Sequence, residues 1–304
     1  MVPFFCFLFI RKKIMWWKIR DWCTNALLAV RLWLYVTFKP KRFKILNEEQ
    51  KDGWDLTFSD EFNQGKLDRK KWRTDAYFGL RFHPGNIIDK GTAPDVYYGD
   101  NMFEFTNSTM KQMANNEPKD IKYVDWDGKD WGNYTIPYRI GQVDSSNSFS
   151  QKYGYWEIRS KITDQPGSWP AFWMVSTDNY PPEIDVYEIY TGRKRGKKSF
   201  SSNFHWRKEP GDREGKKLMN PKAHRVLDVS KDFHTYAVEW NDKCFKVYYD
   251  NLLVRVYSNP EAIKFFEYSM HVIIGNGIHV EQDAHKAIYP TAHEVDYVRV
   301  YKKK

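Results

Sequence analysis

From about residue 52 onward, apolar and polar side chains alternate along short runs of the chain. In residues 152–162, Trp156 and Ile158 fall on one face of the run, whereas Tyr155 and Glu157 fall on the other. A period of two residues is typical of a β-strand with one face turned to a core. Gly, Asn, Asp and Pro separate such runs, and no long stretch of this region has the period of a helix. The pattern therefore predicts a domain built from strands.

Other runs repeat the alternation. Residues 235–240 and 295–301 alternate, and residues 245–249 turn at Asp250-Asn251 into residues 252–257. That last arrangement predicts a β-hairpin, because Asp and Asn tolerate the backbone conformation of a tight turn. Many short strands without intervening helices indicate two packed antiparallel sheets, as in a sandwich or jelly roll. We therefore expect one all-β domain over residues 45–304.

Residues 1–44 have a different composition and form a separate leader in this interpretation. Their first apolar stretch, residues 2–10, is too short to span a bilayer. A second stretch, residues 26–38, is apolar except for Arg31, and tryptophans bracket it. This pattern predicts a helix on a membrane surface or a poor signal-anchor, with an irregular leader as the alternative. We expect secretion or attachment to a membrane or cell envelope, although synthesis without export stays open.

The positive charge of the chain is confined to this leader. The net charge is +9, and residues 1–44 carry ten basic residues against one acid, Asp21, so the remaining chain is formally neutral. The ten are Arg11, Lys12, Lys13, Lys18, Arg20, Arg31, Lys39, Lys41, Arg42 and Lys44. A groove for nucleic acid needs clustered positive charge, so the neutral body argues against such a partner.

Cys244 is the one cysteine after residue 44, so no disulfide can form within residues 45–304. We expect the protein to be a monomer.

Three carboxylates lie within six residues, in the predicted strand 183–188. Side chains alternate along a regular strand, so Glu183 and Asp185 share one face and Glu188 falls on the other. A β-bulge around Val186-Tyr187 adds one residue and returns Glu188 to the face of the other two. Three acids on one face repel each other unless one is protonated, which separates their pKa values for acid and base work. The alternative is three solvated acids on an edge strand.

The segment WPAFWM at residues 169–174, followed by EIDVYE at residues 183–188, resembles the signature of family 16 glycoside hydrolases. The match is to the bulged form shared by laminarinases, agarases and carrageenases, and the resemblance extends over about residues 54–302. It implies a concanavalin A-like β-jelly roll of two antiparallel sheets with an open concave cleft. It also implies a retaining endo-glycosidase that acts on β-1,3 or β-1,4 linkages of a β-glucan or a marine galactan and requires no cofactor.

The resemblance also assigns roles to individual residues. Glu183 is implied as the nucleophile, Glu188 as the acid/base, and Asp185 as the residue that hydrogen-bonds the nucleophile. In a retaining pair the two carboxyl groups lie about 5 Å apart. Trp169 and Trp173 are implied to line the cleft, where an aromatic face stacks on a sugar ring. For Trp173, packing in the core stays open.

Weaker matches extend the implied site. His205 matches a position where many bacterial members have a cleft histidine, and we include it with the adjacent Trp206 among the substrate-binding residues. Asp296 lies where some members ligate a structural calcium on the convex face. A single carboxylate is weak support for such a site, so calcium is an optional expectation and the metal ligands stay unassigned.

Some features leave the substrate and the activity open. Residues 270–279 stand where laminarinases usually have a Gly-Gly-containing loop, so the far side of the cleft is not of the common β-1,3-glucanase type. The strongly basic loop 191–198 fits either a sulfated or uronic-acid polysaccharide or plain solvent exposure.

A non-catalytic, lectin-like carbohydrate-binding domain is one alternative to the hydrolase. A transglycosylase of the same family is another, although its plant members typically read ExDxE, without the extra residue. A membrane-tethered structural or adhesion protein is the third.

Overall fold

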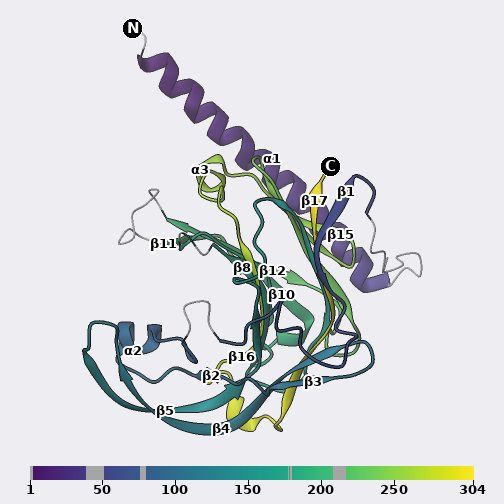
Figure 1. Ribbon diagram of the computed structural model, residues 1–304. Helices are drawn as coiled ribbons and strands as arrows, with labels where there is room; N and C mark the ends of the chain where they lie inside the picture. Colours follow the sequence, from purple (N-terminus) through teal and green to yellow (C-terminus); the bar gives the residue numbers. More distant parts are fainter. Residues whose placement is uncertain (1–2, 39–50, 76–79, 177, 179, 208–216) are drawn as a thin grey trace.

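Two β-sheets are stacked face to face in the body of the protein (Figure 1). The computed structural model describes residues 3–38, 51–75, 80–176, 178, 180–207 and 217–304, with side chains from residue 16 onward. The strands pair antiparallel except for one short parallel pair. The predicted fold, an all-β sandwich of two antiparallel sheets, is confirmed. The predicted boundary between residues 44 and 45 lies outside the described residues.

The larger sheet has ten strands. Its main path runs β15-β14-β13-β7-β17-β4-β5-β2, with β1 on β17 and β3 on β4. The strands are β1 (Trp54–Asp60), β2 (Val96–Tyr98), β3 (Phe103–Phe105), β4 (Met110–Val124), β5 (Asp130–Ile140), β7 (Gly154–Lys161), β13 (His234–Trp240), β14 (Phe245–Tyr249), β15 (Leu252–Tyr257) and β17 (Thr291–Lys303). The hairpin β14–β15 turns at Asp250 and Asn251, whose φ values of 46° and 62° suit a tight turn, as predicted.

The smaller sheet has seven strands and carries the acidic segment. Its order is β11-β10-β9-β8-β16-β6, with β12 beside β10. The strands are β6 (Gln142–Asp144), β8 (Ser168–Val175), β9 (Glu183–Glu188), β10 (Ser199–Arg207), β11 (Lys217–Met219), β12 (Lys222–Arg225) and β16 (His271–Ile278). β9 lies inside the sheet between β8 and β10, so the edge-strand alternative for its acids is wrong. Residues 271–278, where the family's laminarinases usually have a Gly-Gly-containing loop, form strand β16, which pairs with β8 and β6.

Short helices fill some of the connections. They are α2 (Gly85–Lys90), α3 (Pro260–Ile263), and the 3-10 turns η1 (Gly196–Lys198) and η2 (Ala284–Lys286).

One long helix, α1 (Pro3–Phe38), precedes the sheets, and its second half packs along β15 and beside β12. The amide of Asn25 donates to the carbonyl of Val256 at 2.8 Å and accepts from the N–H of the same residue at 3.0 Å. Asp21 accepts from the N–H of Ser258 at 2.7 Å. Since β15 is an edge strand, these side chains satisfy backbone groups that would otherwise be open to further pairing. The alternative of an irregular leader is wrong, because the leader is helical over most of its length.

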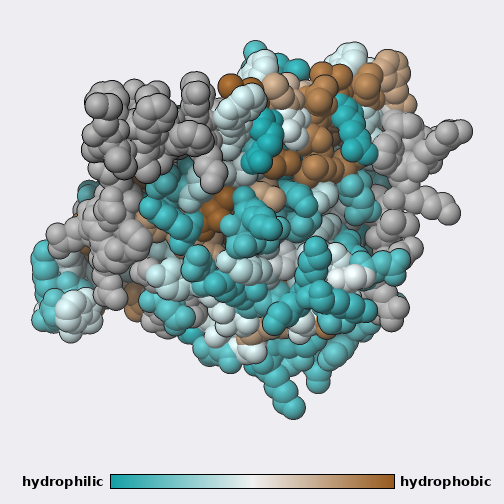
Figure 2. All heavy atoms as spheres, turned by 90° about the horizontal axis from the view of Figure 1, so that it is seen from above, coloured by the Kyte–Doolittle hydropathy of each residue, from teal (hydrophilic) through white to brown (hydrophobic). Residues whose placement is uncertain are grey.

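No helix in the described part of the chain is long and apolar enough to cross a membrane. Figure 2 looks down on the molecule and shows apolar surface gathered along α1, whereas most of the remaining visible surface is hydrophilic.

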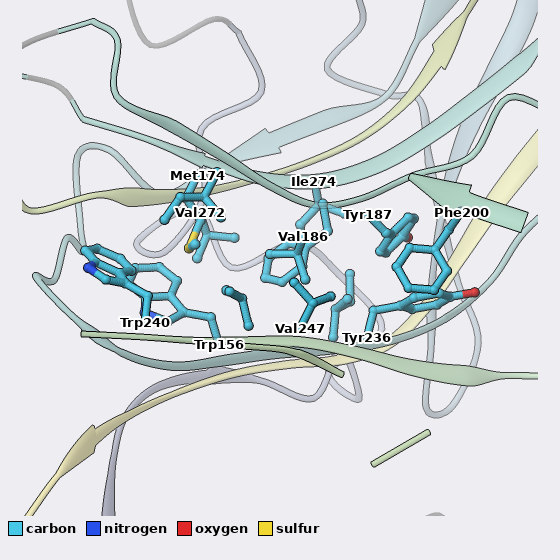
Figure 3. Close-up of a cluster of buried hydrophobic side chains, with 14 of the residues drawn as sticks. Trp156, Met174, Val186, Tyr187, Phe200, Tyr236, Trp240, Val247, Val272 and Ile274 are labelled. Carbon is cyan, nitrogen blue, oxygen red and sulfur yellow. The ribbon is translucent and has the colours of Figure 1, made fainter. Parts of the chain in front are cut away.

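The hydrophobic core lies between the two sheets (Figure 3). Trp156 and Ile158 of β7 enter it, as their alternation predicted, and they meet Met174 of β8 and Val272 of β16 from the other sheet. All four are fully buried. Each such side chain stabilises the fold by roughly 1.5–3 kcal/mol through loss of apolar surface to water. The seven-stranded sheet is thereby held rigidly against the larger sheet, and its other face is left available for polar side chains.

Candidate active site

A β-bulge interrupts β9 at the predicted position. Against β8, Trp173 lies opposite Asp185 and Phe172 lies opposite Tyr187, so Val186 has no partner of its own. The register between β9 and β10 shifts over the same residues. An unpartnered extra residue of this kind defines a β-bulge. The bulge predicted from the parity of the three acids is therefore confirmed.

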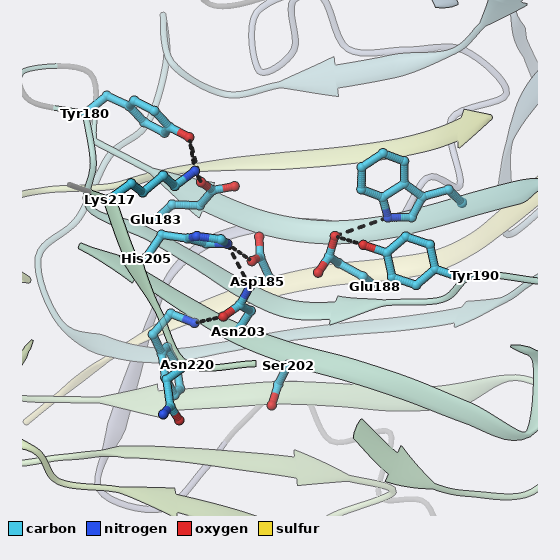
Figure 4. Close-up of polar contacts among 12 residues, drawn as sticks. Tyr180, Glu183, Asp185, Glu188, Tyr190, Ser202, Asn203, His205, Lys217 and Asn220 are labelled. Atoms are coloured by element: carbon cyan, nitrogen blue, oxygen red, sulfur yellow. Dashed lines mark hydrogen bonds and ion pairs between the residues drawn. The ribbon is translucent and has the colours of Figure 1, made fainter. Parts of the chain in front are cut away.

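The bulge places all three acids on the outer face of the seven-stranded sheet. Val186 and Tyr187 both point into the core, although they are consecutive (Figure 3). The alternation therefore resumes one residue later, and Glu188 emerges on the same face as Glu183 and Asp185 (Figure 4). The rigid core beneath Val186 and Tyr187 holds this irregular backbone in place. The hydroxyl of Tyr187 lies 2.9 Å from the hydroxyl of Ser160, within hydrogen-bonding distance.

Glu188 is held by two hydrogen-bond donors on a single oxygen. Its Oε1 accepts from the hydroxyl of Tyr190 at 2.8 Å and from the indole Nε1 of Trp169 at 3.2 Å. The rings of Trp169 and Tyr190 stack with centroids 5.2 Å apart. Burial raises the pKa of Glu188 above its usual value; the bond from Tyr190 opposes this rise, and the charge of Glu183 adds to it. A carboxyl group with a raised pKa can carry a proton at a pH where ordinary carboxyl groups are ionised.

Asp185 is the most enclosed of the three acids. Burial, together with the charges of Glu183 and Glu188, raises the pKa of Asp185 well above its usual value. Its Oδ2 lies 3.0 Å from Nε2 of His205. Burial also lowers the pKa of His205, so the imidazole is held neutral. Both groups are therefore favoured in their uncharged forms, and the enclosed centre of the site avoids a third negative charge.

Glu183 faces a lysine and a tyrosine that sequence reasoning missed. Its Oε2 accepts from the hydroxyl of Tyr180 at 2.9 Å and lies 3.3 Å from the ammonium of Lys217, which also donates to the Tyr180 hydroxyl at 2.7 Å (Figure 4). Tyr180 is three residues from Glu183, but it precedes two prolines and belongs to no strand. Lys217 is 34 residues away on β11. No local pattern connects it to Glu183, because the folding of β11 onto β10 brings it there.

Tyr190 was also missed, although a signal for it exists. It lies two residues after Glu188, and residues two apart share a face when the backbone stays extended. Its donated hydrogen bond to Glu188 is the first among the influences that lower the pKa of this acid.

The two predicted tryptophans of β8 both reach the outer face. Trp169 and Trp173 are partly exposed, whereas Phe172 and Met174 between and beyond them are fully buried. Gly275 of β16 lies beside Trp173, and a Cβ placed on it would be 3.2 Å from the indole. The glycine thus leaves room for the ring to lie close to the sheet. Trp173 is therefore not packed in the core, which was the alternative that the sequence left open.

The two residues of β10 that were predicted to bind substrate, His205 and Trp206, lie on opposite faces of the sheet. His205 is on the outer face beside Asp185, as expected. Trp206 is 8% exposed, belongs to the core between the sheets, and lies with its ring 6.2 Å from that of Tyr257. The prediction that Trp206 binds substrate at this site is wrong, because neighbouring residues of a strand point to opposite faces.

Among the described residues, one group of side chains has the spacing of metal ligands. Ligand atoms of Glu183, Asp185 and His205 lie within 4.8 Å of one another. Glu183 already pairs with the Lys217 ammonium and Asp185 lies within hydrogen-bonding distance of His205, so a cation bound there would have to displace these contacts. Asp296 forms an ion pair with Arg159 instead of joining a ligand group. A structural calcium at Asp296 stays a prediction.

Comparisons with known proteins agree on one family. The sequence profile described as "Glycosyl hydrolases family 16" matches residues 102–298, which is more than half of the chain. The chain is 27% identical over 272 residues to the glucan endo-1,3-beta-glucosidase A1 of Niallia circulans, a match that covers 82% of this chain and 38% of that protein. It is 25% identical over 271 residues to a beta-glucanase of Rhodothermus marinus, covering 82% and 85% of the two chains.

A solved structure supports the same relationship. The catalytic domain of an endo-1,3-beta-glucanase (laminarinase) from Thermotoga petrophila superimposes with a TM-score of 0.63 and 25% identity, covering 83% of this chain and 98% of that domain. The chain spans 38% and 25% of the lengths of the first two curated relatives that it matches.

Proposed function

The chain belongs to family 16 of the glycosyl hydrolases, and from this premise we propose that it is a retaining endo-glycosidase acting on a β-linked polysaccharide. The observation that carries the proposal is the bulge in β9, which turns Glu183, Asp185 and Glu188 to one face. Hydrolysis with retention needs two carboxyl groups on that face, one ionised and one protonated. Burial raises the pKa of Glu188, which favours its protonated form, and the ammonium of Lys217 lies 3.3 Å from Glu183.

The proposed reaction has two steps. In the first, the Glu183 carboxylate attacks the anomeric carbon while Glu188 protonates the leaving glycosidic oxygen, so that a glycosyl ester forms and the aglycone departs. In the second, the Glu188 carboxylate takes a proton from water, which attacks the anomeric carbon and releases Glu183. The bonds from Tyr180 and Lys217 orient the Glu183 carboxylate for attack. A neutral Asp185 beside Glu183 avoids a further negative charge next to the attacking group.

The polysaccharide class follows from the family and from the face itself. Glucan-cleaving relatives favour a β-1,3 or β-1,4 glucan, and a galactan stays the alternative. Trp169 and Trp173 provide partly exposed rings on which sugar rings can stack beside the acids. In the basic loop, the guanidinium of Arg193 lies 4.0 Å from the ring centroid of Tyr190, next to Glu188. Positive charge this close to Glu188 supports the alternative of a glycan that carries sulfate or uronate groups. Secretion or attachment to the cell envelope, and a monomeric state, stay predictions.

Hydrolysis of a panel of polysaccharides tests the proposal. We expect the full chain to shorten at least one of laminarin, lichenan, agarose, porphyran and carrageenan by internal cuts, with the new reducing end formed first as the β-anomer. Size-exclusion chromatography and proton NMR during the reaction measure these two properties.

Three other results would assign a different function. Binding to a glycan without cleavage would favour the lectin-like alternative, and products longer than the substrate would favour a transglycosylase. An α-anomer formed first would contradict the retaining mechanism, since two displacements at one carbon restore its configuration.

The alkaline limb of the pH profile is expected to depend on Tyr190. Activity falls as pH rises through the pKa of Glu188, because the acid must be protonated in the first step. In Tyr190→Phe the hydrogen bond that lowers this pKa is absent, so the limb should move to higher pH in kcat/KM profiles. Tyr248→Phe is the matched control, because its hydroxyl donates to Glu239 on the other sheet at 3.0 Å. An unmoved limb in Tyr190→Phe would argue against Glu188 as the acid.

A further inference from the structure

Over residues 16–38, the side of α1 that faces away from the body is apolar and exposed. Eight of the fifteen large apolar side chains that are exposed in the described residues lie on this helix. We call their central group the outward face of α1. It consists of Ile19, Trp22, Leu27, Val30, Trp33 and Leu34, which are between 44% and 72% exposed. Monomeric proteins seldom expose contiguous apolar surface of this kind without a partner for it.

The geometry of the helix separates this face from the side that packs on the body. At 3.6 residues per turn, the six side chains of the outward face fall within an arc of roughly 140°. The residues that contact the body, among them Asp21, Asn25, Leu28 and Leu32, are centred roughly on the opposite side of the helix. Packing against β15 therefore accounts for one apolar stripe of α1 and leaves a second stripe without any function in the fold.

Positive charge flanks the outward face and negative charge is absent from it. Arg31 follows one border of the arc and Lys18 the other, and both are exposed. Arg20, beside Arg31, is also exposed, and its guanidinium contacts Ser258 and the carboxylate of Asp21. The one acid of residues 1–44, Asp21, points to the body and binds Ser258. The whole net charge of +9 belongs to these 44 residues. An apolar stripe with tryptophans and basic borders is the pattern of a helix that lies in the plane of a membrane surface.

We propose that the outward face of α1 binds the surface of a bilayer that contains anionic lipids and holds the catalytic body against it. The apolar side chains enter the boundary between head groups and acyl chains, and the basic borders contact the lipid phosphates. A second copy of the chain is a poorer occupant, because two outward faces would bring their basic borders together with no acid between them. The contacts of Asn25 with β15 and of Asp21 with Ser258, just after this strand, join the bound helix to the body, so the catalytic sheet keeps one orientation relative to the bilayer.

Binding to vesicles tests this proposal with the full chain, purified in mild detergent and diluted into preformed vesicles. Sedimentation with phosphatidylcholine vesicles that contain about 30% phosphatidylglycerol should show binding at least about tenfold tighter than with phosphatidylcholine alone, since each basic residue adds electrostatic attraction. Raising the salt concentration should reduce this preference. The triple variant Leu27→Gln, Val30→Gln, Trp33→Gln should bind anionic vesicles at least about thirtyfold more weakly, because it removes apolar surface and keeps good helix formers.

A second triple variant controls for the loss of exposed apolar surface in general. Val124→Gln, Trp126→Gln and Ile288→Gln remove exposed apolar side chains away from α1, and this variant should bind vesicles as the parent does. Unfolding temperatures within a few degrees of the parent establish that both variants are folded. Equal binding of the parent to both kinds of vesicle, or undiminished binding of the α1 variant, would overturn the proposal. So would a change from dimer to monomer in the α1 variant by light scattering with vesicle binding unaltered, which would identify the outward face as a contact between copies.

Discussion

Replacing Glu183 by Gln is expected to lower kcat on the best polysaccharide by at least about a thousandfold, because it removes the nucleophile. The amide keeps the shape of the side chain and can still accept from Tyr180, but it cannot attack the anomeric carbon, so the covalent route is lost. Reducing-end assays over long incubations measure the loss. Binding of the glycan should persist, which equilibrium dialysis with a short oligosaccharide can establish.

Glu239→Gln is a closely matched control for this substitution. Glu239 contacts the ammonium of Lys246 at 2.9 Å and the hydroxyl of Tyr248 at 3.0 Å, as Glu183 contacts those of Lys217 and Tyr180. The exposed fractions of the two carboxylates are 17% and 16%. Glu239 lies on the ten-stranded sheet, so its variant should lose a similar ion pair and keep full activity. If both variants lost activity equally, the effect would come from stability and the nucleophile assignment would fail.

The second large effect is expected from Glu188→Gln, which removes the proton donor. Hydrolysis of polysaccharide should fall by about a hundredfold to ten-thousandfold, the range for loss of a general acid–base group. An aryl glycoside whose phenol leaves without protonation should lose much less in the first step, because that step no longer needs the acid. Glycosyl-enzyme should then accumulate, and a burst of phenol in stopped-flow measurements would reveal it.

Added azide separates the roles of the two acids. Azide needs no base to attack the glycosyl-enzyme, so it should restore turnover of the aryl glycoside by Glu188→Gln and give a β-glycosyl azide. Glu183→Gln forms no such intermediate and should give none. If azide left Glu188→Gln inactive, or gave the α-product, the assignment of Glu188 as acid/base in a double displacement would be contradicted.

The bulge in β9 could be predicted from the spacing of the acids along the strand. Glu183 and Glu188 are five positions apart, which is an odd number, so a regular strand cannot present both to one substrate. An extra residue was therefore required between them if they act together, and Val186 is that residue. The alternation of side chains along the strand was enough to predict this extra residue. In the structure Val186 and Tyr187 are both buried in the core, and that packing depends on side chains from both sheets.

The sequence by itself determined the alternation of the strands, the sheet-on-sheet class, the acidic segment and the uneven charge, because each depends on residues close together along the chain. Only the tertiary structure decided which residues complete the site. Lys217 reaches Glu183 through the pairing of β11 with β10, and Trp206 is withdrawn into the core although it neighbours His205. The tertiary structure likewise decided which apolar side of α1 covers β15 and which stays exposed. The positions of Lys217, Trp206 and α1 depend on contacts between segments that are distant in the sequence, and a local sequence pattern does not predict which distant segments come together.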